Sequence, residues 1–171
     1  LGAVQFDKAI CPCYHSASEL NANNKTEVTM RSVEWHDNKV RMIDQRLLPS
    51  EFTLVEYQDY HEVARAILTM VIRGAPAIGA AAAFGMALAA RRSEARDRND
   101  LLTDLQAAGE VLCAARPTAV NLSWAVARLL RRAESEPDPA NIPDALLAEA
   151  QTLADEDVEI NQRMGQHGAT L

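Results

Sequence analysis

Short runs of alternating apolar and polar residues open the first regular part of the chain. The runs Val33–Trp35 and Val40–Ile43 flank Asp37 and Asn38, two residues suited to a tight hairpin turn. A third run with strand character follows at Phe52–Tyr57. The pattern predicts three short strands, the first two of which form an antiparallel hairpin.

After Tyr57 the apolar spacing changes to the period of a helix. Asp59 and Glu62 have the spacing of a capping box, which marks a helix start. Apolar residues follow at helical spacing: Val63, Ile67, Met70 and Val71. A second helix is predicted from Ala75 to Arg91. Since its residues are uncharged up to Ala90, it is expected to be the central helix of a bundle.

Three further helices are predicted in the second half of the chain. The third runs from about Asp100 to Ala115 and the fourth begins at Thr118. A proline-rich loop spans 134–143, and the last helix runs from near Pro143 to the end of the chain. Its expected inward stripe, interrupted by Asp157, is Leu146, Ala150, Leu153, Ile160 and Met164. The predicted fold class is α+β, mainly α, with a small N-terminal antiparallel sheet followed by a helical bundle.

Residues 1–29 differ from the rest of the chain because they show no sustained period. We interpret Met30 as the native start and 1–29 as a poorly ordered upstream arm or expression remnant, the alternative being a true arm that packs on a partner. Residues 30–171 then form one N-terminal helical domain, a size that fits a single hydrophobic core.

Composition narrows the function classes. The formal net charge is −7, which argues against general binding of nucleic acid or an anionic membrane. The uncharged stretch 75–90 is shorter than the ~20 residues of a membrane-spanning helix. No signal peptide is recognised at the start, because Asp7 and Lys8 interrupt the apolar run.

The cysteines favour a reducing compartment. Cys11, Cys13 and Cys113 are odd in number and irregular in spacing, so the cytoplasm is expected. No second Cys or His pair follows the Cys-Pro-Cys motif, and no metal is predicted. Cys113 lies one residue after an inward leucine of the third helix and is interpreted as a packed small side chain.

Two segments share a design that suits a phosphate. Arg73, Gly74 and Ala75 precede or open a helix with no bulky side chain in its first turn, which leaves N–H groups for an anion. Arg116 precedes a proline and Thr118, whose hydroxyl could cap the next helix. The alternative is that each arginine pairs with a carboxylate. The glycines match neither a P-loop nor a dinucleotide-binding motif.

Other polar residues are weaker candidates. Asp157, on the inward face of the last helix, is expected to make a structural hydrogen bond or ion pair, although a ligand contact is the alternative. The acidic run at 155–159 is typical of a solvated face. His167 could act as a base, but an isolated histidine near a terminus more often packs or lies on the surface.

Four blocks of the sequence resemble the methylthioribose-1-phosphate isomerase family. They are Val33–Trp35 with Ile43–Pro49, Val71–Gly85, Arg116–Ala125, and Glu156–Asn161 with Gly165–Gly168. The wider family also contains regulatory subunits of translation initiation factor 2B and ribose-1,5-bisphosphate isomerase. The Asp44-Gln45-Arg46 motif and the intact block after Arg116 favour the methylthioribose branch.

The resemblance implies an aldose-to-ketose isomerisation in methionine salvage, with a small phosphorylated sugar as substrate and no cofactor. It implies that Arg73, Gly74, Ala75 and Arg116 bind this substrate. The family's catalytic cysteine and aspartate lie in a Rossmann-like second domain beyond Leu171, so no catalytic residue is expected in this chain and no turnover by it alone. Apolar surface left by the missing domain is expected to drive homo-oligomerisation. A regulatory sugar-phosphate or nucleotide sensor, ribose-1,5-bisphosphate isomerase and an assembly module without a ligand remain the alternatives.

Overall fold

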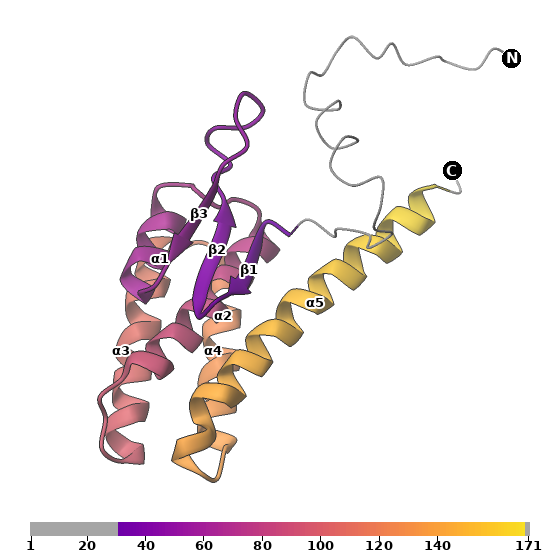
Figure 1. Ribbon diagram of the computed structural model, residues 1–171. Helices are drawn as coiled ribbons and strands as arrows, with labels where there is room; N and C mark the ends of the chain where they lie inside the picture. Colours follow the sequence, from indigo (N-terminus) through magenta and orange to yellow (C-terminus); the bar gives the residue numbers. More distant parts are fainter. Residues whose placement is uncertain (1–30, 170–171) are drawn as a thin grey trace, which may run out of the picture. The chain divides into compact units, whose positions relative to one another are not determined.

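A computed structural model of the chain describes residues 31–169. Three strands are followed by helices, as the sequence predicts (Figure 1). The elements are β1 (Val33–His36), β2 (Lys39–Ile43), β3 (Leu54–Tyr57), α1 (Tyr60–Leu68), α2 (Ala75–Arg92), α3 (Arg98–Ala115), α4 (Val120–Ser135), the short 3₁₀ helix η2 (Pro139–Asn141) and α5 (Ile142–Gly168). The predicted mainly helical α+β class is confirmed. The interpretation of residues 1–29, which include Cys11 and Cys13, lies outside the described residues.

The sheet is antiparallel with the order β1-β2-β3. Asp37 and Asn38 form the predicted hairpin turn, and both have positive φ, 49° and 60°. Such backbone angles at both central residues match the twist of the two strands. Val40 and Met42 of β2 are fully buried, and the Trp35 ring lies 6.2 Å from Phe84 of α2. One face of the sheet therefore packs on the helices.

Helix α1 begins at the predicted capping box. The Asp59 carboxylate accepts a hydrogen bond of 2.7 Å from the N–H of His61, and the Glu62 carboxylate accepts from the N–H of Asp59. The helix ends at Leu68, earlier than the apolar period suggests. Met70 was expected on the inward face but has φ +61° and is 45% exposed, because the chain turns out of the helix there.

Helix α2 is the predicted centre of the bundle. Every residue from Ile78 to Ala90 is buried, and the helix contacts α1, α3, α4, α5 and the sheet. The many alanines allow this, since small side chains let neighbouring helices approach closely on all sides. The observed helix ends at Arg92, one residue beyond the prediction.

The ends of α3 and α4 differ from the prediction. Asp97 caps α3 by accepting from the N–H of Asp100, so the helix starts two residues early. Helix α4 starts at Val120, with no side-chain cap, rather than at Thr118. The N–H of Ala119 donates to the carbonyl of Arg116 over 3.0 Å. This tight turn takes up the residues before the helix, and the prediction that Thr118 caps it is wrong.

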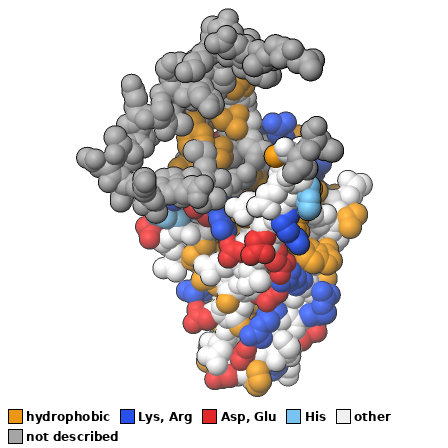
Figure 2. Space-filling view, turned by 90° about the vertical axis from the view of Figure 1, so that its right-hand side faces the viewer, with side chains coloured by type: hydrophobic (Ala, Val, Ile, Leu, Met, Phe, Trp, Pro, Cys, Tyr) orange, Lys and Arg blue, Asp and Glu red, His pale blue; other side chains and the backbone are white. Residues whose placement is uncertain are grey.

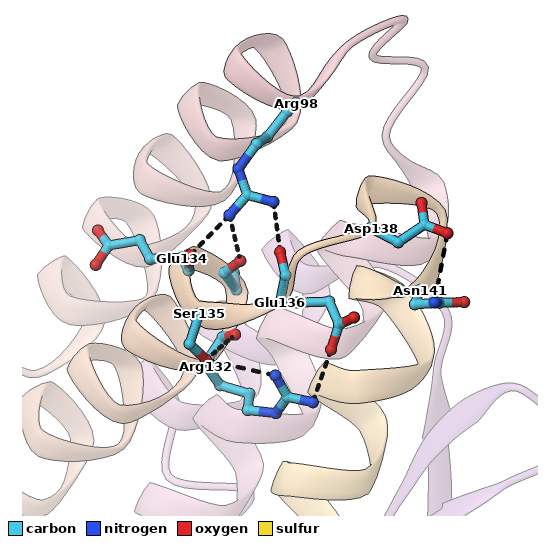
Figure 3. Close-up of polar contacts among 8 residues, drawn as sticks. Arg98, Arg132, Glu134, Ser135, Glu136, Asp138 and Asn141 are labelled. Atoms are coloured by element: carbon cyan, nitrogen blue, oxygen red, sulfur yellow. Dashed lines mark hydrogen bonds and ion pairs between the residues drawn. The ribbon is translucent and has the colours of Figure 1, made fainter.

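The carboxyl end of α4 is closed by a side chain from α3. The Arg98 guanidinium donates to the carbonyls of Ala133, Glu134 and Glu136 at 3.3, 2.7 and 2.5 Å (Figure 3). The last carbonyls of a helix lack the usual partners in a following turn, and a cation is favoured at this end of the helix dipole. The predicted loop at 134–143 is correspondingly shorter, because α4 continues to Ser135 and η2 follows.

Helix α5 is buried only in its first half. Leu146, Ala150 and Leu153 pack inward as predicted. Ile160 and Met164 were expected inward but are 45% and 58% exposed. The helix has 27 residues, and its second half diverges from the other helices (Figure 1). Ile160 and Met164 continue the apolar stripe on this half of α5, where no other helix covers them.

The described part of the chain shows neither a membrane-spanning helix nor a metal-binding cluster. No helix within 31–169 has the length and apolar character needed to cross a membrane. The same residues contain no cluster of three or more His, Cys, Asp or Glu side chains that could hold a metal ion.

Candidate functional site

The segment before α2 presents an arginine and an uncapped helix start. Ile72 is buried, whereas Arg73 is exposed. Gly74 has φ +95°, a conformation that favours glycine, and its carbonyl accepts the first helical hydrogen bond, from the N–H of Ile78. No side chain caps this end, and Pro76 lies in the first turn. The backbone therefore leaves N–H groups available for an anion, as predicted.

Gln45 holds this segment in place. Its backbone N–H donates to the carbonyl of Val71 over 2.9 Å, and its side-chain oxygen accepts from the N–H of Arg73 over 3.2 Å. These two bonds fix the backbone on both sides of Ile72. The sequence motif that contains Gln45 marked a resemblance, but sequence reasoning assigned this glutamine no role.

The residues beside Gln45 form an ion pair between a buried carboxylate and a partly exposed guanidinium. Asp44 is 4% exposed and accepts hydrogen bonds from the backbone N–H, Nε and Nη2 of Arg46 at 3.1, 2.9 and 2.6 Å. The Arg46 guanidinium, through these bonds, lowers the pKa of the Asp44 carboxyl. A charge-assisted bidentate pair of this kind is rigid, and it fixes the turn from which Gln45 projects.

The second predicted arginine stands at the junction of α3 and α4. Arg116 follows the last residue of α3, is half-buried and is followed by the turn that leads into α4. Among residues 31–169, no carboxylate lies within ion-pair distance of the guanidinium of Arg73 or of Arg116. The alternative interpretation, in which each arginine pairs with a carboxylate, is therefore not supported.

The first turns of α2 and α4 meet at one pocket. Gly79 makes this approach close, because a Cβ atom there would lie 3.1 Å from the carbonyl oxygen of Asn121. The pocket has a volume of about 390 Å³. It is lined by Pro76 and Gly79 of α2, by Val120, Asn121 and Trp124 of α4, and by Leu153, Glu156, Asp157, Ile160, Asn161 and Met164 of α5.

The starts of α2 and α4 thus line one pocket, which a phosphate bound by both arginine segments would require. Arg73 and Arg116 do not line the pocket; they precede its first lining residues on α2 and α4 by a few positions. That their guanidinium groups converge on one phosphate is a prediction, which the variants of Arg73 and Arg116 test.

The α5 wall of the pocket is tied to α4 by Arg128. Its guanidinium donates to Glu149 at 2.5 Å and to both oxygens of Glu156 at 2.6 and 2.9 Å, and it lies 5.5 Å from the Trp124 ring centre. The hydrogen bonds from Arg128 lower the pKa of the Glu156 carboxyl. On the face in Figure 2, acidic and basic side chains are interspersed over the described surface and form no continuous basic patch.

Cys113 and Asp157 make the contacts expected of structural residues. Cys113 is half-buried against the core, and burial raises the pKa of its thiol, which fits the predicted packing role. Asp157 accepts a hydrogen bond of 2.9 Å from Asn161, as expected of a structural carboxylate, yet it also lines the pocket. Within the acidic run, Asp155 forms an ion pair with Arg31.

Comparison with known families gives one match. The model of the initiation factor 2 subunit family matches residues 71–171. This range includes both arginine segments, the pocket and the whole of α5.

Curated relatives carry an enzyme name. The chain is 51% identical over 146 residues to a methylthioribose-1-phosphate isomerase from Syntrophotalea carbinolica, covering 84% of this chain and 42% of the relative. It is 47% identical over 146 residues to the enzyme of that name from Geotalea uraniireducens, with the same coverage.

Solved structures share the fold. A 5-methylthioribose 1-phosphate isomerase from Pyrococcus horikoshii OT3 matches with a TM-score of 0.79 and 48% identity, over 82% of this chain and 40% of that chain. Subunit delta of the translation initiation factor eIF-2B from A. fulgidus matches with a TM-score of 0.77 and 41% identity, over 83% and 42%. The chain therefore spans about two fifths of the length of these relatives.

Proposed function

The chain belongs to the initiation factor 2 subunit family, and from this premise we propose that it is the N-terminal part of a methylthioribose-1-phosphate isomerase. The reaction converts an aldose phosphate to a ketose phosphate in methionine salvage. The observation that supports this most is the meeting of two uncapped helix starts at one pocket, each preceded by an arginine that pairs with no carboxylate of residues 31–169.

The proposed role of this chain is to bind the substrate phosphate. Arg73, Gly74 and Ala75 supply a guanidinium and the amino end of α2, and Arg116 supplies a second guanidinium beside α4. Arginine suits a phosphate because its planar fork donates two parallel hydrogen bonds. A helix start adds free N–H groups and the positive end of the dipole.

We place no catalytic residue and no cofactor in this chain. An aldose-to-ketose isomerisation moves a proton between neighbouring carbons, which requires positioned acid-base groups at those carbons. At the pocket, Arg128 holds both oxygens of Glu156, and Asp157 accepts a hydrogen bond from Asn161 through one of its two oxygens. Catalytic groups are assigned to the second domain, in the part of the relatives that this chain does not span.

A regulatory subunit is the second candidate function. It is favoured by the similarity to subunit delta of eIF-2B, whose TM-score and identity approach those of the isomerase. In that case the pocket would bind a sugar phosphate or nucleotide without turnover. The phosphate-binding residues would be the same.

A chimera distinguishes the two functions. Residues 31–171 replace the matching segment of the Syntrophotalea carbinolica isomerase, and turnover of methylthioribose 1-phosphate is measured. We expect activity in the chimera, none in the 171-residue chain alone, and strong loss in the chimera carrying Arg116→Ala. A folded chimera that binds the ester without turning it over would support the regulatory function. Turnover by the purified 171-residue chain would show that its catalytic residues were missed.

We also propose a cytoplasmic, homo-oligomeric protein. A phosphorylated sugar is charged and does not leave the cell freely, so its enzyme belongs in the same compartment. Exposed apolar residues at the pocket, among them Trp124 and Met164, would favour association. Light scattering during size-exclusion chromatography measures the mass, and a monomer at all concentrations would contradict the oligomer.

A further inference from the structure

The pocket has a polar wall that the phosphate site does not use. Asp157 and Asn161 are one helical turn apart on α5 and both line the pocket. On its other side are the first turns of α2 and α4, with Pro76, Gly79 and Asn121. Any ligand whose phosphate lies near those helix starts brings the atoms next to the phosphate toward this wall.

Asp157 and Asn161 are joined to each other by hydrogen bonds. The Asn161 side-chain nitrogen donates to the backbone carbonyl and to one carboxylate oxygen of Asp157, both at 2.9 Å. No hydrogen bond within residues 31–169 engages the other carboxylate oxygen of Asp157 or the amide oxygen of Asn161. The second carboxylate oxygen of Asp157 and the amide oxygen of Asn161 are therefore available to accept hydrogen bonds from a ligand.

The other acid at the pocket is not available in this way. Both oxygens of Glu156 accept hydrogen bonds from Arg128, which also pairs with Glu149. This clamp directs Glu156 toward α4 and fixes α5 one residue before Asp157. Trp124, Ile160 and Met164 add apolar side chains to the same pocket.

Paired hydroxyl groups fit such a wall. A carboxylate accepts hydrogen bonds from two neighbouring hydroxyls, as acidic side chains do on ribose in nucleotide-binding folds. We propose that Asp157 and Asn161 bind the 2- and 3-hydroxyl groups of the sugar phosphate whose phosphate is held at the starts of α2 and α4. This inference rests on the proposed function and adds a subsite for the sugar ring.

The test measures discrimination between sugars by the 171-residue chain. Isothermal titration or NMR titration is run with ribose 1-phosphate, 2-deoxyribose 1-phosphate and inorganic phosphate. We expect wild type to prefer ribose 1-phosphate over the deoxy compound by roughly tenfold, the value of a hydrogen bond to a charged group. Asp157→Ala and Asn161→Ala should each reduce this preference and leave inorganic phosphate binding unchanged.

Glu159→Ala is the matched control, because Glu159 is exposed on the same helix and does not line the pocket. It should retain the full preference. A preference that survives Asp157→Ala, or a wild type that binds phosphate but does not distinguish the two sugars, would overturn the hydroxyl-binding wall and leave the phosphate site intact. Failure of wild type to bind inorganic phosphate or either ester would instead remove the phosphate site, and the wall with it.

Discussion

The side-chain oxygen of Gln45 accepts a hydrogen bond from the backbone N–H of Arg73, 28 residues further along the chain. With the bond from the Gln45 N–H to the carbonyl of Val71, it fixes the segment that leads into α2. The strand region therefore positions the arginine of the candidate phosphate site.

The first prediction concerns Gln45. Gln45→Leu removes the acceptor and leaves the Arg73 N–H without it, so the segment before α2 should lose its fixed geometry. We expect phosphate affinity to fall by roughly fivefold to tenfold, the value of about 1–1.5 kcal/mol for one hydrogen bond. Isothermal titration with inorganic phosphate measures this. Gln58→Leu is the control, and equal affinities in the two variants would contradict the role.

The second prediction concerns Cys113. Because the thiol packs against the core, Cys113→Ala should lower the free energy of unfolding by about 1 kcal/mol and leave ligand affinity unchanged. Burial raises the pKa of this thiol, so alkylation near pH 7 should be slow compared with that of an exposed cysteine. Loss of turnover in the folded chimera carrying Cys113→Ala would contradict the packing role.

Local signals predicted most of the fold. Asp37 and Asn38 set the hairpin, the Asp59 capping box set the start of α1, and the alanine-rich run set α2; each depends on neighbours in sequence. Ile160 and Met164 were misplaced because a helical period shows which face is apolar but not where the partner layer ends.

The candidate site was predicted only in part, because sequence shows local signals but not contacts between distant residues. The two arginine segments each carry a local pattern, so sequence identified them. The contact of Gln45 with Arg73 and the clamp of Arg128 on Glu156 join residues far apart in sequence. No periodicity or spacing encodes such pairs, and only the folded arrangement brings them together.

The third prediction concerns acid stability. The Arg46 guanidinium lowers the pKa of the buried Asp44 carboxyl in the folded state. The stability from this pair is therefore fully present above the unfolded pKa of about 4 and is lost as pH falls through the lower folded value. Asp44→Asn should be less stable than wild type near pH 7, and the difference should shrink on acidification below about pH 4.

Urea unfolding followed by circular dichroism at a series of pH values measures that difference in the free energy of unfolding. Asp155→Asn serves as the control, since its carboxylate is more than half exposed. A gap between wild type and Asp44→Asn that stays constant with pH would show that the charge of Asp44 has no such role.

The fourth prediction concerns the carboxyl end of α4. Arg98→Ala removes the donor to three terminal carbonyls and should lower the free energy of unfolding by about 1–2 kcal/mol. Arg96→Ala is the control, because Arg96 is exposed two residues before α3 and has no hydrogen-bond or ion-pair partner within residues 31–169. Equal stability of the two variants in urea would argue against the cap. Ligand affinity should not change, since the cap lies at the opposite end of α4 from the pocket.

The fifth prediction concerns Arg73 and Arg116 and tests the candidate site directly. If both guanidinium groups bind one phosphate, each Arg→Ala change removes charge-assisted hydrogen bonds worth about 1.5–3 kcal/mol, which raises the dissociation constant roughly tenfold or more. Arg→Lys keeps the charge but loses the planar fork, so it should give a smaller loss. The double alanine variant should lose less than the sum of the single losses, because both residues act on one anion.

Titration measures the phosphate affinity of each variant. The set contains Ala and Lys at Arg73, Ala and Lys at Arg116, and the double alanine variant. Arg65→Ala is the control, since Arg65 is an exposed arginine of α1 that does not line the pocket. Strictly additive losses would mean that the two arginines bind separate groups of the ligand. Unchanged affinity in either single alanine variant would remove that arginine from the site, and the phosphate would then be held by one helix start alone.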